Sequence, residues 1–172
     1  VNNAGHSSKA RSVIYVGQEE WDSVLGVNLN AVYRLCQGVI PSMIENGGGT
    51  IITISSMAAL RPSLMGGAPY SAAKAAVTNL MGCINSEFGN SGIRATAVMP
   101  AEVDTPILLN RPLPPDEQAR STMMGSEDLA DVMLMCAVMP MRTRIDSIVM
   151  SPTVGRDTSA DLEAAKKAGS GA

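Results

Sequence analysis

The sequence has few of the residues from which many kinds of binding site are built. Histidine occurs once, at His6, in a chain of 172 residues. A histidine-based catalytic triad could be built only on that residue, and a metal site with several histidines is excluded. The aromatic residues are one Phe, one Trp and three Tyr, too few for a platform that stacks the bases of single-stranded nucleic acid.

Positive charge and long apolar runs are also scarce. The net charge of −3 argues against nucleic acid as a partner, because phosphate binding needs a basic surface. No apolar run is long enough to span a membrane, and no signal peptide is recognisable. The cysteines Cys36, Cys83 and Cys136 are odd in number and lack metal-binding or redox spacing. They indicate reduced thiols, so we expect a cytoplasmic protein without membrane partners.

Apolar residues are abundant and are arranged in alternating elements. They form 45% of the chain, against 17% charged residues, which is enough for one domain with a packed core. Strands are predicted at residues 1–5, 50–55, 93–99 and 144–151, and helices at 19–46, 71–88 and 126–138. The glycines at 47–49 are interpreted as a helix stop and not as a phosphate loop, because no Lys-Ser/Thr follows. This alternation predicts an α/β fold with a doubly wound parallel sheet, as in Rossmann-like domains.

The predicted domain covers residues 1–156 and contains one irregular segment. Residues 104–125 include four prolines, and we expect them to cover a substrate with a partly apolar lid. Residues 157–172 are small, charged and end in glycine and alanine, which predicts a disordered tail. The chain opens on what reads as the end of a strand, so we expect the domain to be truncated at its N-terminus.

Polar residues follow three of the predicted strands and converge at one rim. They are Asn3 with Gly5, Ser55 with Ser56, and the segment 100–105. In parallel sheets, active sites lie outside the carboxyl ends of the strands. Tyr70 and Lys74 lie one helical turn apart beside this rim. An ammonium near a phenol lowers the phenol's pKa from about 10, which suits a general acid or base. The same spacing also occurs by chance in many helices, so the pair is informative only together with the strand ends.

Five short motifs occur in a characteristic order along the chain. They are Asn2-Asn-Ala-Gly5, Val27-Asn-Leu29, Ile54-Ser-Ser56, Tyr70-Ser-Ala-Ala-Lys74 and Pro100-Ala-Glu-Val-Asp-Thr105. Together they resemble the short-chain dehydrogenase/reductase family, from Val1 to about Pro152. The resemblance implies an NAD(P)-dependent oxidoreductase that interconverts a secondary alcohol and a ketone, with NAD or NADP as cofactor.

The resemblance also implies a role for each catalytic candidate. Tyr70 would donate or accept the proton, and Lys74 would lower its pKa and hold the nicotinamide ribose. Ser56 would hydrogen-bond the substrate oxygen as charge develops on it. On chemistry alone Ser55 is an equal candidate, and Ser56 is chosen because the family places its serine second in the pair. Asn28 would hold a proton-relaying water behind Lys74; without the other motifs it would be read as a satisfied polar residue.

A cofactor cleft is implied by the same motifs. Its expected residues are Asn3, Ala4, Gly5, Tyr70, Lys74, Pro100, Val103 and Thr105. Small residues at the first three positions let the backbone approach a ligand, and Val103 and Thr105 would meet the carboxamide. No metal site is expected.

Two departures from the family pattern affect the cofactor site. Ala101 stands where the family has glycine, and alanine would cost about 1 kcal/mol there if φ is positive. The family's glycine-rich turn and the residue that selects NAD or NADP would precede Val1, in roughly 80 residues at about 30 per βαβ unit. We therefore predict that this chain alone binds dinucleotide weakly or not at all.

A second function remains open. A non-catalytic remnant would act only through the helices at 19–46 and 71–88, which commonly build dimers and tetramers in the family. Both hypotheses predict a homodimer or homotetramer. The presence of Asn28, Ser56, Tyr70 and Lys74 together favours the enzyme.

Overall fold

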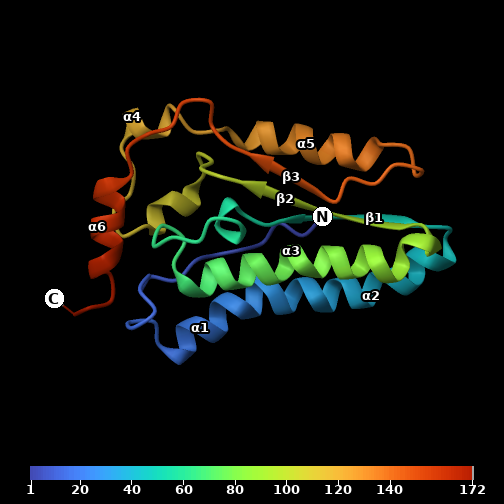
Figure 1. Ribbon diagram of the computed structural model, residues 1–172, viewed down its shortest axis with the longest axis horizontal. Helices are drawn as coiled ribbons and strands as arrows, with labels where there is room; N and C mark the ends of the chain where they lie inside the picture. The colour runs from blue at the N-terminus through green and yellow to red at the C-terminus, as the bar shows by residue number, and fades with distance from the viewer. Residues whose placement is uncertain (172) are drawn as a thin grey trace.

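The computed structural model describes residues 1–171 and is centred on a parallel sheet of three strands. Strand β1 (Gly49–Ile54) pairs with β2 (Ile93–Pro100), which pairs with β3 (Ser147–Met150). The β1–β2 register runs from Gly49 opposite Ile93 to Ile54 opposite Val98. Helices cover both faces of the sheet (Figure 1). The predicted α/β, Rossmann-like architecture is therefore confirmed.

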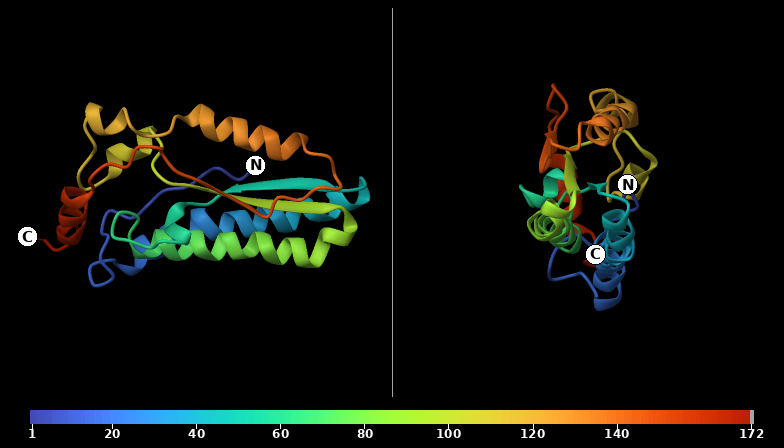
Figure 2. Two further views of the ribbon diagram at one scale, coloured as in Figure 1. Left: turned by 45° about the horizontal axis from the view of Figure 1, so that its top comes forward. Right: turned by 90° about the vertical axis from the view of Figure 1, so that its right-hand side faces the viewer.

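The two faces of the sheet carry separate apolar layers because side chains alternate along a strand. On one face Ile51 of β1 packs with Val77 and Met81 of α3 (Ala68–Phe88) and with Cys36 of α2 (Ala31–Glu45). On the other face its neighbour Ile52 packs beneath α5 (Ser126–Val138). Figure 2 shows α5 on the side of the sheet opposite α2 and α3. All eight residues of β2 are buried, as expected of a strand covered on both faces.

The helix predicted at 19–46 is continuous but is not uniform. It comprises α1 (Gln18–Leu25), a π-helical turn η1 (Gly26–Asn30) and α2. Pro41 lies inside α2 without ending it. The chain leaves the helix through Gly47 and Gly48, whose φ angles of 86° and 131° favour glycine. The interpretation of these glycines as a helix stop is confirmed.

The outer strands are shorter than the sequence predicts. The N-terminal segment forms a single parallel bridge, between Asn2 and Thr53, in place of a strand. Two backbone hydrogen bonds hold the segment against β1. The Asn2 N–H donates to Ile52 O at 2.8 Å, and the Ile54 N–H donates to Asn2 O at 2.9 Å. β3 has four residues, fewer than the eight predicted at 144–151. Pairing with a neighbouring strand, which periodicity does not reveal, sets both lengths.

The expectation of a disordered tail at 157–172 does not hold for most of that segment, and Ala172 lies outside the described residues. Helix α6 (Ser159–Lys167) forms there. The Asp157 carboxylate accepts hydrogen bonds from the Ser159 N–H at 2.9 Å and the Ser159 hydroxyl at 2.6 Å, while Arg156 binds Asp161. The composition of the segment gives no sign of these contacts.

The segment 104–125 is mostly irregular, as expected. It contains a short 3₁₀ helix, η4 (Pro106–Asn110), and one turn of helix, α4 (Glu117–Arg120). No helix within residues 1–171 is both long enough and apolar enough to cross a bilayer.

Candidate active site

A cavity of about 780 Å³ lies at the carboxyl ends of the strands. Nine of the ten residues predicted for the catalytic and cofactor sites line it: Asn3, Ala4, Gly5, Ser56, Tyr70, Lys74, Pro100, Val103 and Thr105. The tenth, Asn28, lies behind it. The structure thus brings together the three strand ends and the first turn of α3, as the rule for parallel sheets requires.

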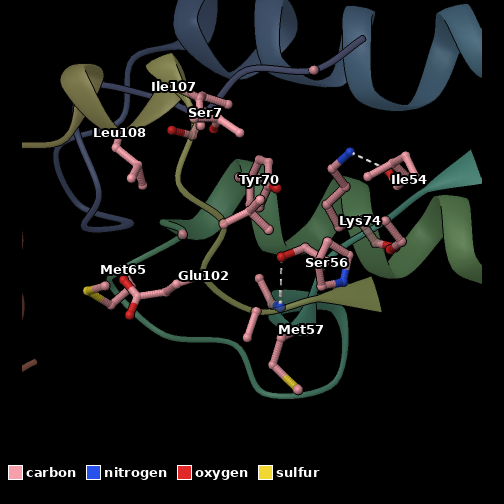
Figure 3. A pocket seen from close by; sticks show the side chains of 18 of the residues that line it. Ser7, Ile54, Ser56, Met57, Met65, Tyr70, Lys74, Glu102, Ile107 and Leu108 are labelled. Atoms are coloured by element: carbon pink, nitrogen blue, oxygen red, sulfur yellow. Dashed lines mark hydrogen bonds between the residues drawn. The ribbon is translucent and has the colours of Figure 1, made fainter. Parts of the chain in front are cut away.

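Lys74 is almost completely buried, with 4% of its surface exposed. Its Nζ donates a hydrogen bond of 2.7 Å to the Ile54 carbonyl at the end of β1 (Figure 3). The same atom lies 5.5 Å from the centroid of the Tyr70 ring. Burial lowers the pKa of the Lys74 amine to about 8. The ammonium still predominates at neutral pH, close to the charge state in which it could stabilise a phenolate.

Tyr70 lies in the first turn of α3, directly after Pro69. Burial raises the pKa of its phenol, and this effect outweighs the opposing influence of the Ser56 hydroxyl and of the Arg11 and Arg111 charges. The net shift is therefore opposite to the fall expected from the sequence, and the influence of Lys74 on this pKa stays a prediction. Sequence spacing placed the two groups correctly, but it did not show how strongly the phenol is desolvated.

Two adjacent serines end β1 and have different surroundings. The Ser55 hydroxyl is buried and donates to the Lys74 carbonyl at 2.9 Å, with the Thr78 hydroxyl 2.6 Å away. These bonds fasten the end of the strand to α3. The Ser56 oxygen accepts the Ala58 N–H at 3.2 Å, its hydroxyl also acts on the Tyr70 phenol, and its side chain is partly exposed in the cavity. Of the two, Ser56 has the hydroxyl that is available to a ligand.

Asn28 lies in the π-helical turn and is 1% exposed. Its Nδ2 donates to the carbonyls of His6 at 2.8 Å and Val24 at 2.9 Å. Its buried Oδ1 has no hydrogen-bond partner among the described residues. A Cβ at Gly5 would lie 2.8 Å from that oxygen and 3.4 Å from Lys74 Nζ. Gly5 therefore separates an unpartnered acceptor from the lysine amine, and only glycine fits there.

The segment after β2 forms another wall of the cavity. Val103 bridges Met124, and the Asp104 N–H donates to Met124 O at 2.8 Å, so the loop is pinned at its base. No residue other than glycine has a positive φ in the described chain. Ala101 is therefore free of the strain that a positive φ would have imposed.

A network of charged side chains at the cavity was missed from the sequence. Glu102 accepts from Arg111 at 2.6 Å and from Arg156 at 2.8 Å, and Arg156 also binds Asp161 of α6 at 2.8 Å. Burial alone would raise the pKa of Glu102, but the hydrogen bonds from Arg156 and Arg111 outweigh it and lower the pKa. Up to 54 residues separate these partners in the chain, and no local pattern links them. The cavity is also lined by Ser7, Arg61 and Met65, none of which was predicted.

The chain is similar to known proteins in both sequence and structure. The family model described as short chain dehydrogenase matches residues 1–114. The 3-oxoacyl-[acyl-carrier-protein] reductase FabG of Chlamydia trachomatis is 39% identical over 105 residues, which cover 61% of this chain and 42% of that protein. The alignment thus spans less than half of that relative.

Solved structures of short-chain oxidoreductases share the fold of this chain. The 3-ketoacyl-(acyl-carrier-protein) reductase of Brucella melitensis, complexed with NADH, superposes with a TM-score of 0.75 at 26% identity. The match covers 87% of this chain and 63% of that structure. A metagenomic short-chain oxidoreductase in complex with NADP gives a TM-score of 0.70 at 28% identity, covering 90% and 61%.

Proposed function

This chain belongs to the short-chain dehydrogenase family, and from that premise we propose that it forms the catalytic part of an NAD(P)-dependent oxidoreductase. The reaction is the interconversion of a secondary alcohol and a ketone. The observation that carries the proposal is the convergence of Ser56, Tyr70 and Lys74 from two elements on one cavity at the strand ends. Related structures hold NADH or NADP, which supports a nicotinamide cofactor.

The cavity fits the nicotinamide end of such a cofactor. Gly5 keeps its backbone free of a Cβ that would meet Asn28 and Lys74, so a ligand can approach this turn closely. Asn3, Ala4 and Gly5 would hold one side, and Pro100, Val103 and Thr105 the other. When bound, the nicotinamide supplies or accepts the hydride.

Tyr70 is the proposed general acid. Because burial raises its pKa, the phenol is protonated at neutral pH and ready to donate to a ketone oxygen. Ser56 is proposed to donate a hydrogen bond to the same oxygen as negative charge develops there. The Lys74 ammonium, held by the Ile54 carbonyl, lies over the ring and stabilises the phenolate that remains.

Asn28 is proposed to hold a water through which protons return from solvent to this site. Its buried Oδ1 has no partner among residues 1–171, and it flanks the same glycine as Lys74 Nζ. A buried acceptor in this position fits an ordered water that links Lys74 to the interior of η1. The two carbonyls bound by Asn28 Nδ2 fix the direction of the oxygen.

A non-catalytic, self-associating protein is the second candidate. Leu35 and Val39 are exposed one helical turn apart on α2, which offers an apolar contact to a second copy of the chain. This surface is compatible with an enzyme as well, because a dimer or tetramer would cover it. The two candidate functions differ in catalysis: the enzyme would turn over a substrate, whereas the second candidate would self-associate without turnover.

The test is a reductase assay on this chain and on the product of its complete reading frame. NADH or NADPH oxidation is followed with a panel of ketones, and the oligomeric state is measured by sedimentation. This chain alone is expected to show little or no turnover. In the longer product we expect turnover that Tyr70→Phe and Ser56→Ala reduce by at least about 100-fold, in the range typical for a positioned acid, while Tyr15→Phe, outside the cavity, leaves it unchanged. Turnover that survives Tyr70→Phe would refute the mechanism. No turnover by the complete protein, with self-association retained, would favour the second candidate.

A further inference from the structure

Arg11 is a buried arginine that the mechanism above does not use. It lies in the loop before α1 and is 2% exposed. Its Nη1 donates to the carbonyls of Met65 at 3.1 Å and Gly66 at 2.9 Å. Its own carbonyl accepts the Ala68 N–H at 3.2 Å, at the first residue of α3. Arg11 therefore binds the loop that leads into Tyr70 at three points.

The charge of Arg11 is not compensated by an ion pair. None of the salt bridges among the described residues includes it, and its buried Nε has no hydrogen-bond partner there. The carboxylate of Glu20 acts on it only at a distance, because it accepts the N–H groups of Lys9 and Ala10. A buried, unpaired guanidinium is costly, and such groups are concentrated at functional sites.

Close packing connects Arg11 to the Tyr70 ring through two glycines. A Cβ at Gly67, where φ is +78°, would lie 3.1 Å from Arg11 Cδ. A Cβ at Gly66 would lie 3.2 Å from Tyr70 Cδ1. The Arg11 side chain and the Tyr70 ring thus pack against the two glycines closely enough to leave little room for a Cβ on either. A shift of Arg11 would be transmitted to Tyr70.

We propose that Arg11 is a positioning residue for Tyr70, which fixes the turn carrying the phenol and supplies a permanent positive charge for the phenolate formed during proton donation. This inference rests on the proposed function. In the reducing direction the Tyr70 O–H bond breaks and its proton goes to the substrate oxygen as the carbonyl carbon gains the hydride. The negative charge stays on Tyr70 Oη until solvent returns a proton. Arg11 is a buried cation outside α3 whose charge acts on this phenol, as does that of Arg111.

The electrostatics of the site agree with this geometry. Arg11 and Arg111 both act to lower the pKa of Tyr70 against the larger effect of burial, as does the Ser56 hydroxyl. Burial lowers the pKa of Arg11, as does Arg111, while Glu20 and Tyr70 act to raise it. The groups that face the phenol are Arg11 from the loop before α1, Ser56 after β1, Lys74 of α3 and Arg111 after η4.

The test measures the phenol directly and does not depend on turnover. Tyrosine labelled with ¹³C at Cζ is titrated by NMR, and Tyr70→Phe assigns the signal. We expect Arg11→Met to raise the Tyr70 pKa by about one unit, as loss of a nearby opposite charge does, and Arg11→Lys to restore most of the shift. Arg34→Met, which removes an exposed cation from α2, is the matched control and should leave the signal unchanged. If Arg11→Met does not fold, Arg11→Gln retains a donor to the loop and is expected to give the same shift.

Kinetics of the complete protein then separate this inference from the proposed function. Arg11→Met is expected to move the phenol limb of the kcat profile to higher pH and to lower kcat more than it changes KM. An unchanged Tyr70 pKa in folded Arg11→Met or Arg11→Gln overturns the role of Arg11, whatever the activity. A shifted pKa in a protein that reduces no ketone overturns the proposed function and leaves the electrostatic link between Arg11 and Tyr70 in place.

Discussion

Replacing Lys74 by methionine should change how the stability of the protein depends on pH. The amine is 4% exposed, and burial lowers its pKa from 10.5 to about 8. At about 1.4 kcal/mol per pKa unit, this shift places the cost of burying the charge at about 3 kcal/mol. The unfolded chain binds more protons than the folded chain between pH 8 and 10.5, so stability rises with pH across that window. Above 10.5 the penalty is absent, and below 8 it is present in full.

Methionine removes the charge but also the hydrogen bond of 2.7 Å to the Ile54 carbonyl. Leaving that carbonyl without a partner costs about 1–3 kcal/mol, which nearly cancels the gain at pH 7. A comparison at one pH is therefore uninformative, and the slope is the quantity to measure. Relative to Lys74→Met, the wild-type chain should gain about 3 kcal/mol of unfolding free energy between pH 8 and 10.5.

The assay is urea unfolding followed by the fluorescence of Trp21, the single tryptophan, at several pH values from 7 to 10.5. Lys167→Met, which removes an exposed amine from α6, is the control and should run parallel to wild type. Parallel curves for wild type and Lys74→Met would show that the buried amine is not desolvated as described. The reasoning about its charge state in the site would then fail.

Two further changes probe the cavity walls. Arg156→Met leaves Glu102 and Asp161 short of a partner they both bind and should lower the unfolding free energy by about 3 kcal/mol, with exposed Arg142→Met as control. Arg156 and Arg111 hold the pKa of Glu102 low, so the stabilisation from the ionised Glu102 is lost in wild type as pH falls below the usual glutamate range. If Arg156→Met loses stability on acidification as steeply as wild type does, the role of Arg156 in this network is contradicted. Gly5→Ala places a Cβ 2.8 Å from Asn28 Oδ1 and should lower the unfolding free energy by about 1–3 kcal/mol. Gly17→Ala, whose Cβ would meet nothing within 4 Å, is the control and should lower it far less. Equal losses in the two variants would mean that Gly5 is not closely packed.

Much of the fold follows from the sequence because its signals are local. The β-branched run at 50–54 and the glycines at 47–49 define a strand and the helix stop before it. The helix from Ala68 to Phe88 starts within three residues of its predicted position. The strand ends that form the cavity follow from these elements, since parallel strands bring their carboxyl ends to one edge.

The parts that the sequence did not predict depend on long-range contacts. Helix α6 is held by Arg156, which reaches both Asp161 and Glu102, and segment composition does not encode that pairing. The direction of the Tyr70 pKa depends on how much water the folded chain excludes, which spacing alone cannot show. The sequence does not separate Ser55 from Ser56 on chemistry, whereas in the structure the Ser55 hydroxyl is occupied by its contact with Thr78.

The π-helical turn at Gly26–Asn30 also fixes the angular phase between α1 and α2. Each residue of an α-helix advances the chain by about 100°, from 3.6 residues per turn, whereas a π turn accommodates one residue more. Val24 before the turn and Val32 after it are both buried, so α1 and α2 turn the same side toward the core although the turn between them holds one residue more than a regular helix would. Deleting one residue within Gly26–Asn30 would let the turn relax to regular helix with α1 and α2 still in phase, because the wider turn is what accommodates that residue. Asn28, which lies in the turn, would then lose its position while Glu20 of α1 would keep its own, so the side chain behind this cavity is held by an irregular turn within a long helix.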